Sequence, residues 1–254
     1  MKLIVAILTD FGTQDHYVGV MKGVMLGINP EITLVDISHD VPSHSVIAAQ
    51  FLLEVSHRYF PKGTVFLVVV DPGVGSSRRA MVLKTEDYLF VGPDNGVFTP
   101  FYRGEWEAFE LPVPETASNT FHGRDVFAPA AARLTLKIPP YRLGKPFDDP
   151  ITVEMPSPVV TPEGVRGQII YIDKFGNLIT NINAGLIRSA EQVEIIVRGR
   201  KIRGIVRAYA DVPEGELLAI IGSSERLEIS VREGSAREAL GAKIFDEVEV
   251  RMRG

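Results

Sequence analysis

Acidic residues end three apolar segments in the first hundred residues, and carboxylates placed this way could bind or activate a small ligand. Asp10, Asp71 and Asp94 each have glycine close by. Apolar, β-branched runs such as Val68-Val69-Val70 are typical of strands inside a sheet. Because ligands bind outside the carboxyl ends of strands in open α/β sheets, we expect the three carboxylates to share one rim.

The loop after Val70 is the most informative of the three. Asp71-Pro72-Gly73 stops the strand and turns the chain, and Arg78 follows in the same loop. Taken alone, the loop is equally consistent with a turn that carries a surface acid and an arginine. The similar loops at Asp10 and Asp94 favour a ligand site, because clustered carboxylates raise one another's pKa and are costly without a purpose.

A histidine adds a group that can move protons. His122 lies in the segment 120–125, ahead of a predicted helix with Pro129 in its first turn. A single histidine in such a place is usually a structural group. Together with the loop of Asp71 and Arg78 it becomes a candidate for proton transfer, because histidine titrates near neutral pH.

Up to Arg142 the pattern alternates apolar strands with helical segments. Such alternation predicts βαβ units, so we expect an α/β N-terminal domain over residues 1–142 with a mostly parallel sheet. The predicted strands include 2–8, 34–37, 64–70 and 88–91, and the predicted helices are 18–28, 43–59 and 128–136.

The composition changes beyond residue 142. Prolines are so dense around the segment 143–164 that it cannot be helix or central strand, and we expect an extended linker there. Residues 165–254 carry short β segments separated by turn residues, which predicts a smaller all-β, barrel-like C-terminal domain. Its predicted strands are 167–173, 192–197, 201–206, 217–221, 227–231 and 247–252.

The first turn of this second domain is also polar. Asp173 and Asn177 flank Lys174-Phe175-Gly176 at the end of a predicted strand. Turn chemistry alone is consistent with a plain hairpin here. A strand that ends in an acid, a glycine and an amide is also the pattern seen at the candidate ligand loops of the first domain.

Charge and composition exclude several classes of protein. The chain has 254 residues, a formal net charge of −5 and no cysteine. It therefore has no electrostatic footprint for DNA or RNA and no disulfide, thiolate metal site or cysteine nucleophile. The apolar residues 1–8 meet Asp10 too early for a signal peptide or membrane anchor, so we expect a core strand and a cytoplasmic protein.

The chain resembles the S-adenosylmethionine (SAM) hydrolases that form adenosine, also called SAM hydroxide adenosyltransferases, in five ordered motifs: Thr9-Asp10-Phe11-Gly12, Asp71 to Gly75 with Arg78, Gly92 to Gly96, Phe121 to Asp125, and Asp173 to Asn181. These enzymes are related to SAM-dependent fluorinase and chlorinase. The resemblance covers both domains. It implies an α/β domain followed by a β-barrel-like domain, and a homotrimer whose active sites lie between the N-domain of one subunit and the C-domain of its neighbour.

The resemblance implies hydrolysis of SAM to adenosine and L-methionine by attack of water on the ribose C5′ carbon. The sulfonium is already a good leaving group, so the reaction needs a base and a cation near the water, and no cofactor or metal. The family assigns this task to Asp71, Arg78 and His122. We expect Arg78 to make Asp71 a poor base, which leaves His122 as the proton acceptor and Arg78 to stabilise hydroxide.

The family resemblance also implies the contacts with the substrate. A carboxylate such as that of Asp10 suits a ribose diol because it can accept two hydrogen bonds. The implied contacts are Asp10 to the ribose, Asp173 to the methionine ammonium, Asn177 to an adenine edge, and, in the segment 222–231, Ser223 to the methionine end, the backbone near Val231 to adenine, and Glu228 as a further substrate-binding residue.

Two departures from the halogenases bear on the reaction. They have an arginine after the motif serine, whereas this chain has Ser224-Glu225, so Arg226 is the candidate to bind the methionine carboxylate. They also have a halide pocket of small hydroxyl residues and an extra loop, whereas this chain has His122 and Arg78 and no long insertion. These differences favour water as the nucleophile.

Two other functions are consistent with parts of the sequence. Metal-dependent nucleoside hydrolases also open with an Asp-rich loop, and Asp10, Asp71, Asp94 and His122 are potential ligands, but the segment 9–16 lacks their denser acidic run. A non-catalytic adenosine or SAM sensor is the second alternative. It would have no use for a group of residues that activates water.

Overall fold

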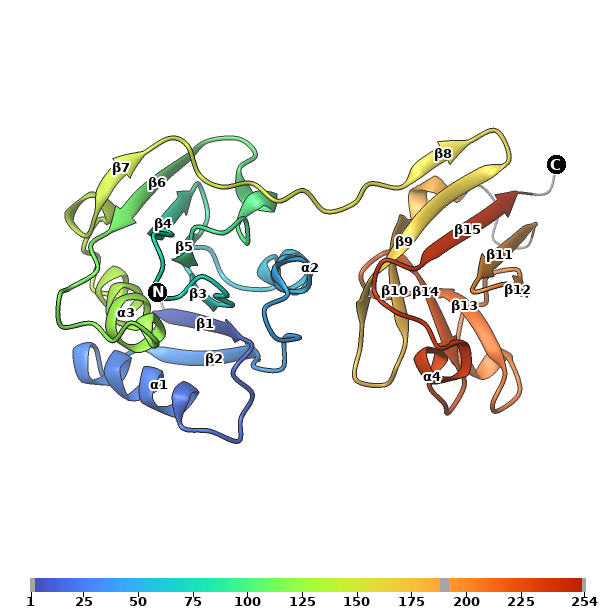
Figure 1. The fold of residues 1–254 in the computed structure, drawn as a ribbon, viewed down its shortest axis with the longest axis horizontal. Helices are drawn as coiled ribbons and strands as arrows, with labels where there is room; N and C mark the ends of the chain where they lie inside the picture. The colour runs from blue at the N-terminus through green and yellow to red at the C-terminus, as the bar shows by residue number, and fades with distance from the viewer. Residues whose placement is uncertain (1–2, 188–191, 253–254) are drawn as a thin grey trace. The chain divides into compact units, whose positions relative to one another are not determined.

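The structure is a computed structural model that describes residues 3–187 and 192–252, so residues 1–2, 188–191 and 253–254 of the predicted domains lie outside the described part. The chain divides into two compact units, Met1–Glu154 and Met155–Gly254. The division falls inside the proline-rich segment 143–164, of which residues 149–158 contain no helix or strand (Figure 1).

The first unit is built on a seven-stranded sheet with the strand order β2-β1-β3-β5-β4-β6-β7. β1 (Ile4–Thr9) lies between β2 (Thr33–Ser38) and β3 (Val65–Val69), and both pairings are parallel. β3 also pairs in parallel with β5 (Leu89–Pro93). The four strands predicted in this part of the chain are confirmed, and the carboxyl ends of β1 and β3 lie at the same edge.

The other half of this sheet is antiparallel. β4 (Ala80–Thr85) pairs antiparallel with β5 and with β6 (Trp106–Leu111), and β6 pairs antiparallel with β7 (Lys145–Phe147). The sheet is therefore mixed, and the predicted mostly parallel arrangement fits only its β2-β1-β3-β5 half. Residues 86–88 alone join β4 to β5, whereas a parallel pair needs a crossover of about a dozen residues, so this connection has to be a hairpin.

Helices cover both faces of the sheet, close to where they are predicted. They are α1 (Tyr17–Ile28), α2 (Val46–His57) and α3 (Ala128–Thr135), with short helical turns at η1 (Thr99–Phe101), η2 (Gly123–Phe127, π-helical) and η3 (Pro140–Arg142). Buried residues of α1 and α3 share one apolar core with Val5 and Ile7 of β1. α2 also packs on β1 and lies on the other side of it from α3 (Figure 1).

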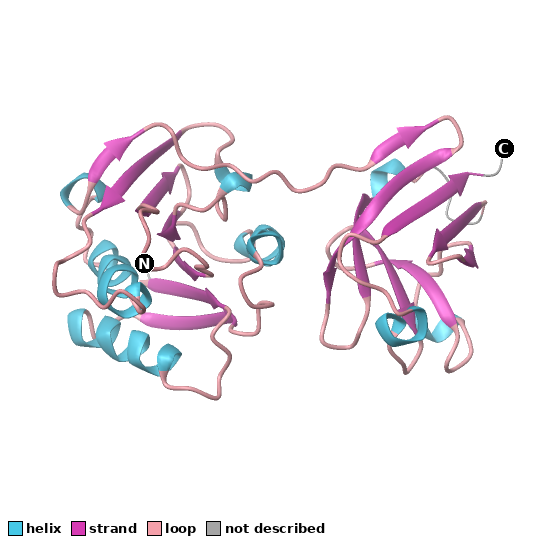
Figure 2. Ribbon diagram, in the orientation of Figure 1, coloured by secondary structure: helices cyan, strands magenta, loops and turns pink. Residues whose placement is uncertain are grey.

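The second unit is mostly β (Figure 2). Its strands are β8 (Val159–Thr161), β9 (Gly164–Ile172), β10 (Leu178–Asn183), β11 (Val193–Val197), β12 (Arg200–Arg203), β13 (Leu217–Ile221), β14 (Arg226–Val231) and β15 (Glu247–Met252), with short helices η4 (Ala184–Leu186), η5 (Tyr209–Asp211) and α4 (Ala236–Leu240). The sheet follows the order β12-β11-β15-β9-β10-β14-β13, and β8 pairs with β9. β12 and β13, at the two ends of this order, contact each other. The sheet is nearly closed around one apolar core, which confirms the barrel-like prediction.

No helix within the described residues is long and apolar enough to span a membrane.

Candidate active site

The loops that follow β1 and β3 meet at a cavity of about 250 Å³ in the first unit. Asp10 follows β1 directly, Asp71 lies just beyond β3, and His122 immediately precedes η2. The structure thus brings these three predicted residues to one cavity. The other residues that line it are Phe11, Ser43, His44, Val69, Val74, Thr120, Phe121 and Gly123.

Arg78 joins Asp71 to His122. Its Nε donates to Asp71 Oδ1 at 2.9 Å and to Oδ2 at 3.1 Å, its Nη2 also donates to Oδ2, and Nη2 lies 2.8 Å from His122 Nδ1. The side chains of Arg78 and Asp71 are 7% and 6% exposed, so solvent and salt screen this pair little. Arg78 Nη1 is buried and has no hydrogen-bond partner among the described residues.

The Arg78 contact determines where His122 carries its hydrogen. A guanidinium can only donate, so Nδ1 must accept, and the neutral ring has its hydrogen on Nε2. Burial and then the charge of Arg78 lower the pKa of His122 from its usual 6.5, against the opposite effect of Asp71 and Asp125. At neutral pH the ring is therefore uncharged, with Nε2–H free to donate.

The loop that carries Asp71 and Arg78 packs tightly against the loop that precedes His122. Gly75 has φ +75°, and a Cβ atom there would lie 2.4 Å from the backbone oxygen of Asn119. Both the left-handed conformation and the close approach require glycine. On the other side, Asp125 Oδ2 accepts the Ser118 backbone N–H at 2.8 Å and so holds the 118–122 loop in place.

Asp10 is held by the segment that precedes α2. Its Oδ2 accepts the backbone N–H of His44 at 2.9 Å, and His44 is also among the residues that line the cavity. His44 is not among the site residues predicted from the sequence. The only signal in the sequence is the turn before Ser45, the residue that caps α2, and a turn does not tell which way a neighbouring side chain faces. The φ of +64° at His44 could not be foreseen either.

Asp94 does not join the other two carboxylates. Its side chain is buried, accepts from Arg79 Nε at 2.8 Å and from the Ile151 backbone N–H at 2.8 Å, and is absent from the cavity lining. Arg79 also donates to Asp149 Oδ1 at 2.6 Å. Asp94 therefore follows β5 at the same edge of the sheet, as expected, but its carboxylate does not share the cavity and instead ties residues 149–151 to β5.

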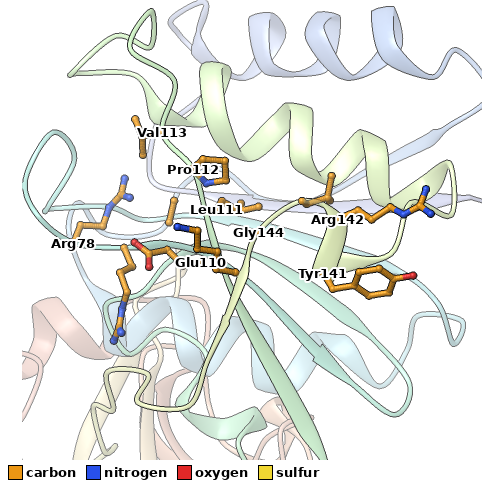
Figure 3. Close-up of a pocket in the computed structure, with 12 residues that line it drawn as sticks. Arg78, Glu110, Leu111, Pro112, Val113, Tyr141, Arg142 and Gly144 are labelled. Atoms are coloured by element: carbon orange, nitrogen blue, oxygen red, sulfur yellow. The ribbon is translucent and has the colours of Figure 1, made fainter.

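A larger cavity, about 510 Å³, lies beside β6 and β7. Figure 3 shows Arg78 at one end of it and Tyr141 and Arg142 at the other. Asp71 and His122 do not line this cavity, and the guanidinium of Arg78 is bonded to Asp71. Asp71 and His122 therefore belong to the smaller cavity, whereas Arg78 lines the larger one and is joined to the smaller one through its bonds to Asp71 and His122.

In the second unit, Asp173 and Asn177 form a polar hairpin turn between β9 and β10. Asp173 Oδ1 accepts the backbone N–H groups of Phe175 and Asn177, both at 2.9 Å, and its Oδ2 accepts Asn177 Nδ2 at 2.9 Å. The plain-hairpin interpretation is thus correct for the backbone. The same bonds orient the Asn177 amide, so Asp173 has a structural task besides any contact with substrate.

The remaining predicted substrate contacts lie along β14. Leu178 pairs with Ile229, so Asn177 and Val231 lie near one end of β14, whereas Ser223 lies in the turn before its other end, about 17 Å away for a strand of this length. Glu228 lies between them, and its Oε1 accepts from Tyr209 Oη at 2.6 Å and Ser230 Oγ at 2.9 Å. Burial, followed by Glu228, raises the pKa of Tyr209 to about 12.

Within residues 3–187 and 192–252, no three histidine, aspartate or glutamate side chains are grouped so that they could hold a metal ion.

The family models and the similar proteins of known function point to the same family. Residues 5–144 match the model of the SAM hydroxide adenosyltransferase N-terminal domain, and residues 167–249 match that of its C-terminal domain. An (R)-S-adenosyl-L-methionine hydrolase from Thermus thermophilus is 41% identical over 93% of this chain and 94% of its own. A fluorinase from Actinopolyspora mzabensis is 28% identical over 74% of each chain.

A solved structure shows the same fold. The crystal structure of an uncharacterized conserved protein from Thermotoga maritima superposes with a TM-score of 0.90 at 40% identity and covers 97% of this chain and 99% of its own. The chain is thus a two-domain protein with an Asp-Arg-His site on its α/β unit. It belongs to the SAM hydroxide adenosyltransferase family.

The contact between the two loops at Gly75 predicts opposite effects for two glycine substitutions. Gly75→Ala should lower the free energy of unfolding by at least about 1–2 kcal/mol, because alanine is strained at positive φ and its Cβ meets Asn119. Gly23→Ala, in the open middle of α1, should raise it by roughly 0.5–1 kcal/mol. The single tryptophan, Trp106, lies in β6, so its fluorescence during denaturant unfolding reports the first unit. Equal effects of the two substitutions would contradict the tight packing of these loops.

Proposed function

We propose that this chain hydrolyses (R)-S-adenosyl-L-methionine to adenosine and L-methionine. The observation that carries the proposal is the Arg78 guanidinium bonded to both Asp71 and His122 beside the cavity that Asp10 shares. Support comes also from the family and from the hydrolase of Thermus thermophilus, whose name gives this substrate.

The reaction is a displacement at the ribose C5′ carbon. The water oxygen forms a bond to C5′ while the bond from C5′ to sulfur breaks, and the sulfur keeps the electron pair and becomes the thioether of methionine. One proton of the water must leave. Because the sulfonium needs no proton to depart, the site has to aim the water opposite the sulfur and accept its proton, and a metal or cofactor is not required.

The bond between Arg78 and His122 favours a division of roles that differs from the sequence-based hypothesis. His122 Nδ1 already accepts from Arg78, and Nε2 of the neutral ring carries a hydrogen, so the ring has no lone pair left for the proton of water. Asp71 Oδ1 accepts one hydrogen bond in the structure and can accept another. We therefore assign proton acceptance to Asp71 and water orientation to His122 Nε2–H, with Arg78 holding both.

The charge around the cavity favours water over a halide ion as nucleophile. Asp10 and Asp71 both line it, and the positive charge of Arg78 is already paired with Asp71. An anion would meet uncompensated negative charge, whereas neutral water and a cationic sulfonium would not.

Products and isotope label test the reaction itself. EDTA-treated protein incubated with SAM in oxygen-18 water should release methionine and adenosine with the label in the 5′-hydroxyl, because the oxygen comes from solvent. Mass spectrometry measures both. Unlabelled adenosine, or 5′-chloroadenosine formed in chloride, would contradict activation of water, and release of adenine would indicate a nucleoside hydrolase instead.

The assigned roles predict that His122 and Asp71 tolerate amide substitutions differently. His122→Gln places an amide N–H near the position of Nε2, so kcat should stay within about tenfold of the unchanged protein, whereas Asp71→Asn should lower kcat by about 10²–10⁴-fold through loss of the proton acceptor. His122→Leu removes the donor and serves as the matched control, and Trp106 fluorescence verifies folding. A loss in His122→Gln as large as that in Asp71→Asn would return proton acceptance to His122.

We also propose a homotrimer in which each site uses both units of the protein, from different subunits. The family resemblance supports this arrangement, as do the candidate substrate contacts, which fall on Asp10 in the first unit and on Asp173, Asn177, Ser223, Glu228 and Val231 in the second. In this proposal Asn177 and the backbone near Val231 bind adenine, and Ser223 binds the methionine end.

Subunit mixing tests this assembly. Chains with His122→Ala and chains with Asn177→Ala, each inactive alone, should recover about a quarter of full activity when they assemble at random, because one site in four then combines two unaltered halves. As a control, mixing His122→Ala chains with chains that carry both His122→Ala and Asn177→Ala should recover no activity, because no chain then supplies an unaltered His122. Verified mixed trimers without activity would show that each site belongs to one chain.

A further inference from the structure

A chain of polar side chains, buried at Thr9 and His39 and exposed at Asp36, lies behind the Asp10 loop and takes no part in the proposed chemistry. Thr9 Oγ1 and His39 Nδ1 are 2.9 Å apart, and His39 Nε2 lies 3.1 Å from Asp36 Oδ1. Asp36 Oδ2 in turn accepts from Lys22 Nζ at 2.6 Å. Thr9 is fully buried and His39 is 5% exposed, and neither lines the cavity.

One direction of hydrogen bonding satisfies the Thr9 hydroxyl, whereas the buried His39 Nε2 makes no hydrogen bond within the described residues although Asp36 Oδ1 lies 3.1 Å away. If neutral His39 carries its hydrogen on Nε2, facing the carboxylate of Asp36, then Nδ1 accepts the hydroxyl hydrogen of Thr9. The Thr9 oxygen can then accept the Phe11 backbone N–H, which lies 3.4 Å away. Because Thr9 has no access to solvent, its hydroxyl hydrogen would be left without an acceptor if His39 were removed.

Backbone bonds connect the same residues to the ribose-binding carboxylate. Gly12 N–H donates to the His39 carbonyl at 2.8 Å, and Val41 N–H donates to the Thr9 carbonyl at 3.3 Å. Asp10 lies between Thr9 and Gly12, and its carboxylate accepts from the backbone of His44, further along the His39 loop. The loops after β1 and β2 are therefore held together on both sides of Asp10.

We propose that Thr9 and His39 are positioning residues that hold Asp10 in the orientation that binds the ribose diol. The inference rests on the proposed function, in which Asp10 makes that contact. Neither residue touches the substrate, so their effect reaches it only through the loop.

Positioning of this kind has a distinct kinetic signature. When the loop adopts its binding geometry for only a fraction of the time, the apparent dissociation constant rises by the inverse of that fraction. Bound substrate has already selected the correct geometry, and the groups that act on water, Asp71 and His122, lie on other loops. Loss of the Thr9–His39 bond should therefore raise KM and leave kcat nearly unchanged.

The test uses pairs of variants that differ by single polar groups. Thr9→Val keeps the shape of the side chain and removes the hydroxyl, and Thr9→Ser keeps the hydroxyl. Thr135→Val is the matched control, because Thr135 is another buried threonine whose hydroxyl accepts from Asn29 Nδ2 at 2.9 Å. It lies with Leu3 and Ile4 beside a different cavity, next to the start of β1.

We expect Thr9→Val to raise the KM for SAM and the dissociation constant for adenosine about tenfold, the equivalent of one hydrogen bond, with kcat within about threefold. Thr9→Ser should restore most of the affinity, and Thr135→Val should lower the unfolding midpoint without changing either constant. Calorimetric titration with adenosine and steady-state kinetics measure these quantities. As a second pair, His39→Asn keeps an acceptor for Thr9 and His39→Leu does not, so only His39→Leu should weaken binding.

Two failures can be told apart. If the unchanged protein does not hydrolyse SAM, the proposed function is wrong. If it does, but Thr9→Val resembles Thr135→Val in affinity, or lowers kcat with KM unchanged, the positioning role is overturned.

Discussion

The bond from Arg78 to both Asp71 and His122 is the interaction on which the site depends. The three groups come from two loops, and only the guanidinium contacts both of the others. Burial of Arg78 and Asp71 removes their hydration, a cost that the bidentate pair offsets because its geometry satisfies several donors and acceptors at once. The same bond occupies Nδ1 of His122 and so decides which proton transfers the imidazole can make.

The fold supplies the constraints that keep this bond in place. Parallel pairing of β1 and β3 delivers Asp10 and Asp71 to the same edge, and the π-helical turn before α3 brings His122 to meet them. Gly75 permits the contact between the loop of Arg78 and the loop that precedes His122, and Thr9 and His39 join the loop of Asp10 to its neighbour. The polar groups of the second unit are organised by a similar device, since the Asp173 carboxylate orients Asn177 through the hairpin.

Local patterns in the sequence predicted the parts of the fold that local physics determines. Apolar runs that end in acid and glycine located β1, β3 and β5, and helical spacing located α1, α2 and α3 within a few residues. The order and direction of the strands in the sheet were harder to predict from the sequence. The half of the sheet around β4 depends on a connection of three residues, 86–88, and β4, β6, β7, β8 and β10 were not identified as strands.

The sequence predicted which residues form the candidate site better than it predicted which side chains those residues bind. Asp10, Asp71, Arg78 and His122 stand out because charged groups follow buried strands or precede a helix. Asp94 shows the same pattern, yet its carboxylate binds Arg79. The sequence does not tell which of the adjacent residues Arg78 and Arg79 pairs with Asp71 and which pairs with Asp94. The hydrogen position on His122 follows from the direction of one hydrogen bond, which only the three-dimensional geometry provides.

Nitrogen-15 NMR of histidine-labelled protein tests the central claim most directly, because the chemical shifts of the two ring nitrogens distinguish the tautomers and the cation. The signals of His122 are assigned by their loss in His122→Gln. At neutral pH the account predicts a neutral ring with hydrogen on Nε2 and an unprotonated Nδ1 that accepts from Arg78. A ring with hydrogen on Nδ1, or an imidazolium at neutral pH, would contradict it.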